Sequence, residues 1–539
     1  LIKNSNFIGK LKVIIKNMAH YSALIKNGIV FDGKGNPGKK TDIGLSGDKI
    51  KKIGELSGST ADDVINAEGK YVCPGFIDMT THSDTHFTLF SSPRQESFFR
   101  QGVTTILGGN CGSSLAPLLS GEAAEALSKW TDVSKVNINW RTVGEMLGEL
   151  DKRRLGVNFC TLVGLDTLYK SVLDEIKQVD GEALDQLKLV LKNSIKEGAF
   201  GVSTSLSAES ILRLGDDNVM EILKEVKSND ALVKHHLEDE GKNILSSLSK
   251  VLHLARNSRA RTQISHFKAL GKSAWSVLPQ ALEMIRTARK DGVDITCDFF
   301  PYERTGSSLF EFLPAWIKKD GREKVQDILR LRDSGERKDL VSYLNSLTLH
   351  YDKITIASTL HDFSSVGKTI EKIAEESGIT GEEVILNLLE VNNLQVSIFS
   401  EVINEENIKE IAMENYSILA SDGVGYDVSS NTSEIMKDLA HPRSFGAFPR
   451  FLSSFAKKGI IKWEDAIYKM TSAPAKVIGI KDRGVIANGN YADIVVFDPV
   501  AIEDKSTYNT PYRLPLGIDR VIINGKPSFE MAGRVIRSK

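Results

Sequence analysis

Short apolar runs rich in β-branched residues alternate along most of the chain with longer stretches whose apolar positions recur every three or four residues. The first pattern is typical of buried strands and the second of amphipathic helices. The helical pattern is clearest at 181–197 and 274–290. The apolar runs predict strands at 75–79, 104–107, 157–163, 201–204, 231–234, 261–265, 294–297 and 416–419. Eight strand–helix units predict an α/β fold of the (β/α)₈ TIM-barrel type, covering residues 74–484.

The two ends of the chain have a different, all-β pattern. Short alternating runs surround turn signals such as Asn27-Gly28 near the N-terminus and Asn524-Gly525 near the C-terminus. Two small β segments at opposite ends of a long chain predict one β-sandwich domain, built from residues 18–73 and 485–539.

One connection is too long for a simple strand–helix unit. The stretch from about 303 to 394 is charged and helix-rich, and it precedes the last predicted strand. It is interpreted as a helical insertion in the barrel. Long insertions often act as lids over a binding site. An extra helical layer without contact to substrate is the alternative.

Composition excludes some classes of partner and favours one compartment. The chain of 539 residues carries 69 basic and 70 acidic side chains, a net charge of −1, which gives no basis for nucleic acid as the main ligand. No apolar run reaches the length of a transmembrane helix. The four cysteines are widely spaced and include no Cys-x-x-Cys pair, which favours reduced thiols in the cytoplasm. Residues 1–17 are interpreted as a flexible extension before a natural start at Met18.

Five chemically reactive side chains follow five different predicted strands. Because the carboxyl ends of parallel strands meet at one face of a barrel, these side chains are expected to converge. A thiolate, imidazoles and a carboxylate that meet there would make a hydrolytic metal centre. Taken singly, each has a structural explanation, such as an Asp-Gly turn for the carboxylate. The set comprises His82, Cys111, His236, His266 and Asp422.

The motifs around these residues resemble a known family. They read Pro-Gly-Phe-Ile-Asp at 74–78, Gly-Asn-Cys-Gly at 109–112, Ile-Ser-His-Phe-Lys at 264–268, Asp-Phe-Phe-Pro-Tyr at 298–302, Ser-Asp-Gly at 421–423 and His-Pro-Arg at 441–443. Over nearly the whole chain the sequence is similar to the amidohydrolase superfamily, and within it to the N-acyl-D-amino-acid deacylases. The Asn-Cys-Gly motif is the most specific, because most amidohydrolases have a lysine in place of this cysteine.

The resemblance implies roles for individual residues. Cys111, His236 and His266 would hold a tightly bound zinc ion, and His82 would belong to a second metal position. Asp422 would act as general base and then as general acid. The carboxylate of an N-acyl amino acid, a small-molecule substrate, would be bound by a basic and phenolic cluster composed of Lys268, Tyr302 and Arg443.

Two departures from the family pattern bear on these roles. The first strand of the family ends in His-x-His, whereas this chain has Thr80-Thr81-His82. A hydroxyl is a poor zinc donor beside an imidazole, so the second metal position is expected to be weak or empty, unless His86 takes the vacant place. The family commonly has a tyrosine shortly after the fourth-strand motif, whereas this chain reads Ser-Thr-Ser-Leu-Ser-Ala at 203–208, and Glu238 stands where arginine is usual. The missing tyrosine and arginine together predict altered side-chain selectivity.

The predicted function is therefore zinc-dependent hydrolysis of N-acyl-D-amino acids, giving a carboxylate and a D-amino acid. One alternative is a cyclic-amide hydrolase of the dihydroorotase or hydantoinase type, although such enzymes usually use a carboxylated lysine where Cys111 stands. The other alternative is a degenerate, non-catalytic member of the fold that serves as a binding protein. The sequence assigns neither the acyl group and amino-acid side chain nor the oligomeric state.

Overall fold

Parallel strands form the centre of the protein in the computed structural model, which describes residues 19–121, 123, 127, 137–173, 179–318, 321–428 and 438–539. The predicted extension at residues 1–17 lies outside the described residues. The central strands are β8 (Phe76–Asp78), β9 (Val103–Gly108), β10 (Asn158–Thr161), β11 (Val163–Gly164), β12 (Gly201–Ser205), β13 (Leu232–His236), β14 (Arg261–Ile264), β15 (Ile295–Phe299) and β19 (Ser417–Leu419). All eight predicted strands are present, and the third is interrupted at Leu162.

The pairing of these strands is parallel throughout. One sheet has the order β10-β9-β8, and the next has the order β11-β12-β13-β14-β15-β19. An isolated parallel bridge joins Thr81, just past β8, to Gly423, just past β19. All six residues of β9 are buried, as expected for strands that are covered on both faces. The strand ends that carry the predicted site therefore lie at one face of a TIM-barrel-type α/β fold.

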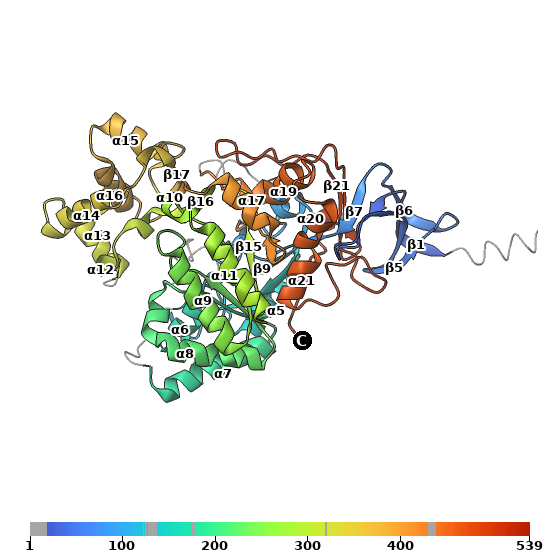
Figure 1. Cartoon of the computed structure of the whole chain (residues 1–539), viewed down its shortest axis with the longest axis horizontal. Coiled ribbons are helices and arrows are strands. Elements are labelled where there is room, and N and C mark those ends of the chain that lie inside the picture. The colour runs from blue at the N-terminus through green and yellow to red at the C-terminus, as the bar shows by residue number, and fades with distance from the viewer. Residues whose placement is uncertain are drawn as a thin grey trace, which may run out of the picture.

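Helices follow the strands and cover them. They include α5 (Val143–Asp151), α6 (Leu165–Leu173), α7 (Gly181–Lys196), α8 (Glu209–Ser228), α9 (Ile244–Ser258), α11 (Leu278–Lys290), α17 (Glu405–Met413), α19 (Arg443–Phe451), α20 (Trp463–Met470) and α21 (Ser472–Ile478). Helix α7 is representative: the carboxylate of Asp180 accepts a hydrogen bond from the N–H of Ala183 at its start, and Leu187 and Leu191 are buried on one stripe. Helices α7, α8, α9 and α11 pack side by side in this order (Figure 1).

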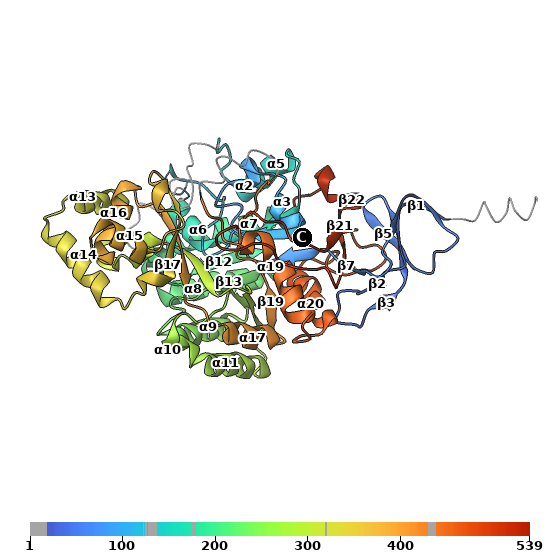
Figure 2. The same ribbon diagram turned by 90° about the horizontal axis from the view of Figure 1, so that it is seen from above.

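The two ends of the chain form neighbouring sheets. One sheet has the order β5-β4-β1-β6, and the other combines both ends in the order β22-β21-β20-β7-β2-β3. Residues such as Ile25, Ile43, Val72 and Ile494 belong to one apolar core shared by the two sheets, which lie at one end of the molecule (Figure 2). The strands are β1 (His20–Lys26), β2 (Ile29–Val30), β3 (Lys39–Lys40), β4 (Asp42–Ser46), β5 (Lys49–Gly54), β6 (Thr60–Asn66), β7 (Tyr71–Pro74), β20 (Ile494–Phe497), β21 (Ile518–Ile523) and β22 (Lys526–Pro527).

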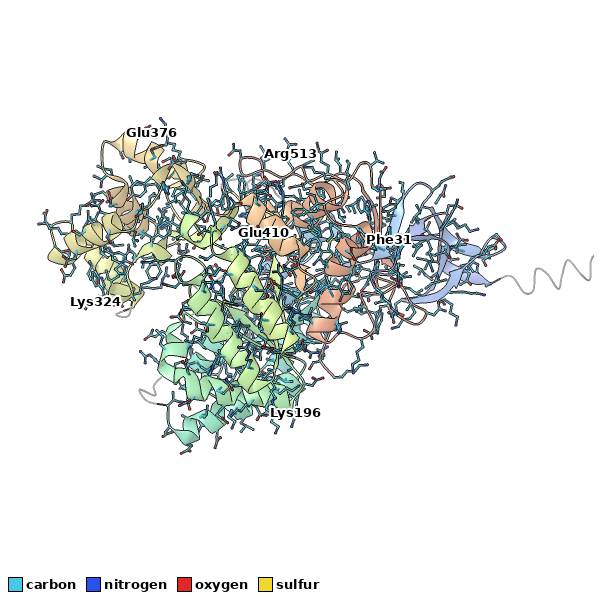
Figure 3. All side chains as sticks on the ribbon, viewed as in Figure 1. Phe31, Lys196, Lys324, Glu376, Glu410 and Arg513 are labelled. Atoms are coloured by element: carbon cyan, nitrogen blue, oxygen red, sulfur yellow. The ribbon has the colours of Figure 1, made fainter. Side chains whose placement is uncertain are left out.

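The long connection before β19 contains more than the predicted helices. An antiparallel sheet, β16-β18-β17, is formed by β16 (Arg304–Ser308), β17 (Ile354–Thr359) and β18 (Val396–Glu401). The helices are α12 (Ala315–Lys318), α13 (Arg322–Arg330), α14 (Gly335–Ser346), α15 (Ile370–Ser377) and α16 (Gly381–Val391), and they share a separate apolar core. Figure 3 shows that Lys324 and Glu376, two residues of this long connection, lie at the opposite end of the molecule from Phe31. The sheet extends to Glu401, so the structured segment is longer than predicted.

No helix in the described part of the chain is long and apolar enough to cross a bilayer.

Candidate metal centre

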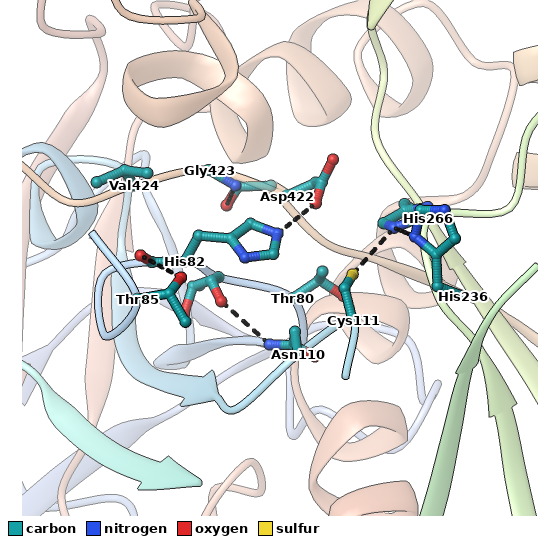
Figure 4. A network of polar contacts seen from close by, with 12 residues as sticks. Thr80, His82, Thr85, Asn110, Cys111, His236, His266, Asp422, Gly423 and Val424 are labelled. Atoms are coloured by element: carbon teal, nitrogen blue, oxygen red, sulfur yellow. Dashed lines mark hydrogen bonds and ion pairs between the residues drawn. The ribbon is translucent and has the colours of Figure 1, made fainter. Parts of the chain in front are cut away.

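The predicted site residues come together from five strand ends. His236 is the last residue of β13, whereas His82, Cys111, His266 and Asp422 lie in the loops that follow β8, β9, β14 and β19. In Figure 4, His82 points toward Asp422 and the sulfur of Cys111 points toward His266. The parallel order of the strands thus places side chains that are up to 340 residues apart within one site.

Three of these residues have a strained backbone. Cys111 has φ = 53°, His266 has φ = 34° and Asp422 has φ = 52°. A residue with a Cβ atom rarely adopts this left-handed region, and each such conformation costs on the order of 1–3 kcal/mol. Strain of this kind is concentrated at functional sites. Its recurrence at three strand ends favours a functional constraint on the side-chain directions.

Cys111, His236 and His266 form a compact set of possible metal ligands. One ligand atom from each lies within 4.8 Å of the other two. The Cys111 Sγ to His266 Nε2 distance is 3.3 Å, and the His236 Nδ1 to His266 Nε2 distance is 3.0 Å. One sulfur and two imidazole nitrogens suit zinc, and three protein ligands leave a fourth position open, as in catalytic zinc sites. The donor set therefore fits the ion that the family resemblance implies.

The surroundings of Cys111 favour its thiolate form. Burial opposes ionisation, but the neighbouring His266, His236 and His82 outweigh it and hold the pKa of the Cys111 thiol well below its usual value. The thiolate, not the thiol, is the form that binds a metal. In contrast, burial raises the pKa of Cys73, Cys160 and Cys297, which are the other cysteines of the chain.

Glu240 orients one of the imidazoles, a role that the sequence did not reveal. Its Oε1 lies 3.1 Å from His266 Nδ1 and 2.6 Å from Lys268 Nζ. Burial opposes ionisation of Glu240, but Lys268 and His266 outweigh it and lower its pKa to about 2. A carboxylate at Nδ1 fixes the hydrogen there, which leaves Nε2 free for a metal. The motif His-Leu-Glu-Asp-Glu held the signal, because Glu240 follows His236 by four residues.

The carboxylate of Asp422 lies between His82 and Arg443. Its Oδ1 lies 3.1 Å from His82 Nε2, and its Oδ2 lies 2.7 Å from NH1 of Arg443. Burial opposes ionisation, but Arg443, His266 and His82 hold the pKa of Asp422 well below its usual value. Asp422 is consequently a carboxylate at neutral pH, which is the form that can accept a proton.

The cations of the site differ in how fully they are engaged. Lys268 Nζ contacts Glu240 Oε1, His266 Nδ1 and the His266 carbonyl oxygen, at 2.6, 2.9 and 3.2 Å. Arg443, the first residue of α19, is ion-paired with Asp422, but its N–H groups at Nε and NH1 have no hydrogen-bond acceptor among the described residues. The 2.7 Å contact is therefore an ion pair in which the N–H does not point at the oxygen. Arg443 has unused donors, whereas Lys268 is held by Glu240 and the His266 carbonyl oxygen.

Tyr302 lies beneath the start of α19. Its hydroxyl donates to Asp504 Oδ2 at 2.8 Å and approaches the Pro442 carbonyl oxygen at 3.4 Å. Burial and the neighbouring Asp504 raise the pKa of Tyr302 well above its usual value. Because its single hydrogen goes to Asp504, the Tyr302 hydroxyl has no donor left for a substrate carboxylate.

His86 lies outside the compact ligand set. The three-residue group that could hold a metal within the described ranges contains Cys111, His236 and His266, and does not contain His86. Burial and the neighbouring His82 and Arg443 lower the pKa of His86 to about 3, so its imidazole is neutral at physiological pH.

Asp78 lies on β8, below the site, and its buried carboxyl group is expected to make the stability of the folded protein depend on pH. Its Oδ1 accepts hydrogen bonds from the N–H groups of Thr80 and Ser421, whereas its fully buried Oδ2 has no partner among the described residues. Burial raises its pKa from 3.8 to about 7. Because the pKa of Asp78 is higher in the folded than in the unfolded state, the contribution of Asp78 to stability is greatest below pH 4. That contribution is lost as pH rises toward 7.

The substitution Asp78→Asn is therefore expected to have a more favourable effect on the free energy of unfolding at pH 8 than at pH 5. The difference between the variant and the native protein in free energy of unfolding should shift by at least about 1 kcal/mol between these pH values. Denaturant titration at both pH values measures it. An equal effect of the substitution at pH 5 and pH 8 would show that Asp78 is ionised throughout.

Comparison with known proteins agrees with this geometry. A model of the amidohydrolase family matches residues 344–528. N-acyl-D-glutamate deacylase of Alcaligenes xylosoxydans xylosoxydans is 28% identical, over 95% of this chain and 96% of its own. The N-acyl-D-glutamate deacylase of Bordetella bronchiseptica, solved with zinc and a phosphonate inhibitor that mimics the tetrahedral intermediate, superposes with a TM-score of 0.81 at 25% identity, covering 96% of this chain and 100% of that one. The chain is therefore similar over nearly its whole length to N-acyl-D-glutamate deacylases.

A second solved amidohydrolase bears on the metal content. This D-aminoacylase superposes with a TM-score of 0.79 at 25% identity, and the match covers 96% of the present chain and 100% of the D-aminoacylase chain. It is described as having a binuclear metal centre, with activation by one metal ion and attenuation by the second. Amidohydrolases with this fold thus include proteins that contain zinc and proteins with two metal positions. In this protein, the residues around Thr80 bear on the number of metal ions.

Proposed function

We propose that this protein hydrolyses the amide bond of N-acyl-D-amino acids and releases a carboxylate and a D-amino acid. The observation that carries the proposal is the cluster of Cys111, His236 and His266 beside the ionised Asp422. Its support is the similarity of nearly the whole chain to enzymes named N-acyl-D-glutamate deacylase, whose name describes this reaction.

We further propose one tight zinc site, formed by Cys111, His236 and His266. Zinc at a site of this kind supplies Lewis acidity, which makes a water molecule more acidic and an amide carbonyl more electrophilic. The second position has His82 and Thr80, and a hydroxyl in place of an imidazole makes it weak. His82 is also engaged with Asp422.

Asp422 carries the proton in the proposed reaction. One carboxylate oxygen accepts a proton from the attacking water as the new C–O bond forms. The same carboxyl group then donates that proton to the nitrogen of the leaving amine as the C–N bond breaks. His82 and Arg443 hold the two oxygens of Asp422 in place during this transfer.

Arg443 is the favoured partner for the substrate carboxylate, because it retains unused donors in a buried position. A guanidinium can bind a carboxylate through two parallel N–H groups. Phe300 lies against this site, with its ring centre 4.8 Å from the Arg443 guanidinium carbon and 5.9 Å from Lys268 Nζ. Lys268 adds positive charge at the same place, although its ammonium is engaged with Glu240 and His266.

The proposal includes the domain division predicted from the sequence. The barrel, residues 74–484, supplies all of the residues named above, and the β-sandwich consists of residues 18–73 and 485–539. The insertion contacts the site region through Arg304, since the carbonyl oxygen of Arg304 lies 2.9 Å from His441 Nε2. His441 in turn accepts a hydrogen bond from the Arg443 backbone N–H, which supports a lid role for the segment.

The test is hydrolysis by purified, zinc-loaded protein. N-acetyl-D-amino acids with acidic, apolar and polar side chains are compared with their L forms, and dihydroorotate and a hydantoin are included as cyclic amides. Release of free D-amino acid from the D series alone is expected. Hydrolysis of the cyclic amides alone would favour the cyclic-amide alternative. No hydrolysis of any substrate by protein with bound zinc would favour the non-catalytic alternative.

Arg443→Met is expected to lower the preference for free-acid substrates over their methyl esters by about 10–100-fold, because a charge-assisted hydrogen bond contributes roughly 1.5–3 kcal/mol. Both substrates will lose rate, since Arg443 also contacts Asp422, so the ratio of the two kcat/KM values is the readout. Lys268→Met should lower the same ratio by a smaller factor.

Arg450→Met is the matched control. Arg450 lies on the same helix, packs on the Tyr302 ring and is ion-paired with Glu303, but contacts none of the proposed metal ligands. Its loss should leave the acid-to-ester ratio unchanged. An Arg443 variant with an unchanged ratio would assign the substrate carboxylate to another group.

A further inference from the structure

A lysine is buried inside the ring of parallel strands, directly below the proposed metal centre. Lys234, Thr80 and Asp298 are all fully buried, with 0% exposure. Lys234 Nζ lies 2.5 Å from the Met79 carbonyl oxygen, 2.6 Å from Thr80 Oγ1 and 3.1 Å from Asp298 Oδ2. The ammonium thus donates hydrogen bonds to two oxygens, and the carboxylate of Asp298 balances its charge.

The position of this ammonium follows from the strands. Lys234 lies two residues before His236 on β13, so both side chains point to the same side of the strand. Thr80 lies two residues before His82 and appears between His82 and Cys111 in Figure 4. Thr80 is also the residue that replaces the first histidine of His-x-His. Lys234 therefore contacts the residue at which a second metal would need its missing ligand.

The hydroxyl of Thr80 is already committed. It donates its single hydrogen to Asp298 Oδ1 at 2.9 Å and accepts a hydrogen bond from Lys234 at 2.6 Å. Asp298 is fixed in turn by the His266 backbone N–H at 2.7 Å and by Gln263 Nε2 at 3.1 Å. The network joins the loop after β8 to β13, β14 and β15. The network therefore holds the loop that contains His266 and the buried residues below the proposed metal centre.

We propose that Lys234 is a built-in cation that takes the place of the second metal ion and restricts the centre to a single zinc. A divalent ion beside Thr80 would face the ammonium in a buried region, where repulsion between like charges is only weakly screened. The inference rests on the metal site of the proposed function and deepens it. The second-metal attenuation described for the D-aminoacylase should accordingly be absent in this protein.

The test compares zinc bound per chain after equilibration with excess zinc and removal of free metal. The native protein and Thr80→His are each expected to retain about one zinc ion, because the histidine alone still faces the ammonium. Thr80→His/Lys234→Met should bind about two, because it supplies the imidazole and removes the charge. Excess zinc should leave the activity of the native protein unchanged and should lower that of the double variant.

Lys469→Met is the matched control for loss of a buried lysine. Lys469 is also buried, and it bonds to the backbone oxygens of Glu414 and Ser417, away from the proposed ligands. Its loss should leave zinc content at about one per chain. If Thr80→His/Lys234→Met does not fold because Asp298 is left unpaired, adding Asp298→Asn removes both buried charges together and restores the balance.

The outcomes separate this inference from the proposed function. Two tightly held zinc ions in the native protein or in Thr80→His would overturn the inference, and so would a single zinc ion in the folded double or triple variant. Each of these results is independent of the substrate. A native protein that binds one zinc ion, follows the expected pattern across the variants, and hydrolyses no N-acyl amino acid would support the inference and overturn the proposed function.

Discussion

Asp422→Asn is expected to lower turnover by about 10²–10⁴-fold, the usual contribution of general acid–base catalysis. Asparagine has the same shape and retains one acceptor for His82 or Arg443, but it cannot take a proton from water at neutral pH. The loss should appear in kcat for N-acetyl-D-amino acids. Because Asp422 is not part of the compact ligand set, zinc per chain should stay near the native value.

Asp493→Asn is the control for removing a buried carboxylate. Asp493 is paired with Arg483 at the junction of the barrel with the terminal sheets, and it contacts none of the site residues. This variant should lose stability while the folded protein keeps its turnover. Retention of more than about a tenth of native turnover by Asp422→Asn would remove Asp422 from the proton-transfer role.

Cys111→Ala is expected to abolish both tight zinc binding and hydrolysis. The thiolate is the only anion in the proposed ligand set, and two neutral imidazoles make a much weaker zinc site. The loss of zinc affinity should exceed the roughly 10–100-fold cost of removing an outer partner such as Glu240. Elemental analysis of the dialysed protein, with kcat measured in parallel, gives both readouts.

Cys160→Ala provides the comparison. Cys160 is a fully buried thiol on β10, and burial raises its pKa, so it is not a metal-binding thiolate. Its removal should leave zinc content and turnover near native. Should Cys111→Ala retain one zinc ion per chain after dialysis, the ligand set would have to be reassigned.

The sequence predicted the parts of the fold that have a local signal. The central strands are short and apolar, so their positions could be recognised without knowledge of their partners. Strand β16 has the sequence Arg-Thr-Gly-Ser-Ser and is half-buried at every residue, so no alternation marks it as a strand. It becomes a strand by pairing with β18, almost 100 residues later.

The same limit applies to the site. His82, Cys111, His236, His266 and Asp422 could be chosen because each follows a recognisable strand. Their mutual geometry, and the roles of Glu240 and Asp298, depend on contacts between distant segments.

Lys234 shows the limit most clearly. As the end of a predicted strand at 231–234 it resembles an ordinary surface lysine, but β13 continues to His236 and places Lys234 inside. From the sequence Thr80 was only a missing histidine. Its contacts with Lys234 and Asp298 show that the position is filled by other polar groups.

The pairing of β7 with β20 has a consequence for synthesis of the chain. Val72 pairs with Val496, and Cys73 with Val495, so the edge of β7 stays open until the ribosome has added some 420 further residues. At about 5–20 residues per second this takes roughly 20–80 s, during which β7 exposes backbone groups that could pair with another nascent chain. A transcript that ends before residue 494 would yield a protein that keeps this edge permanently.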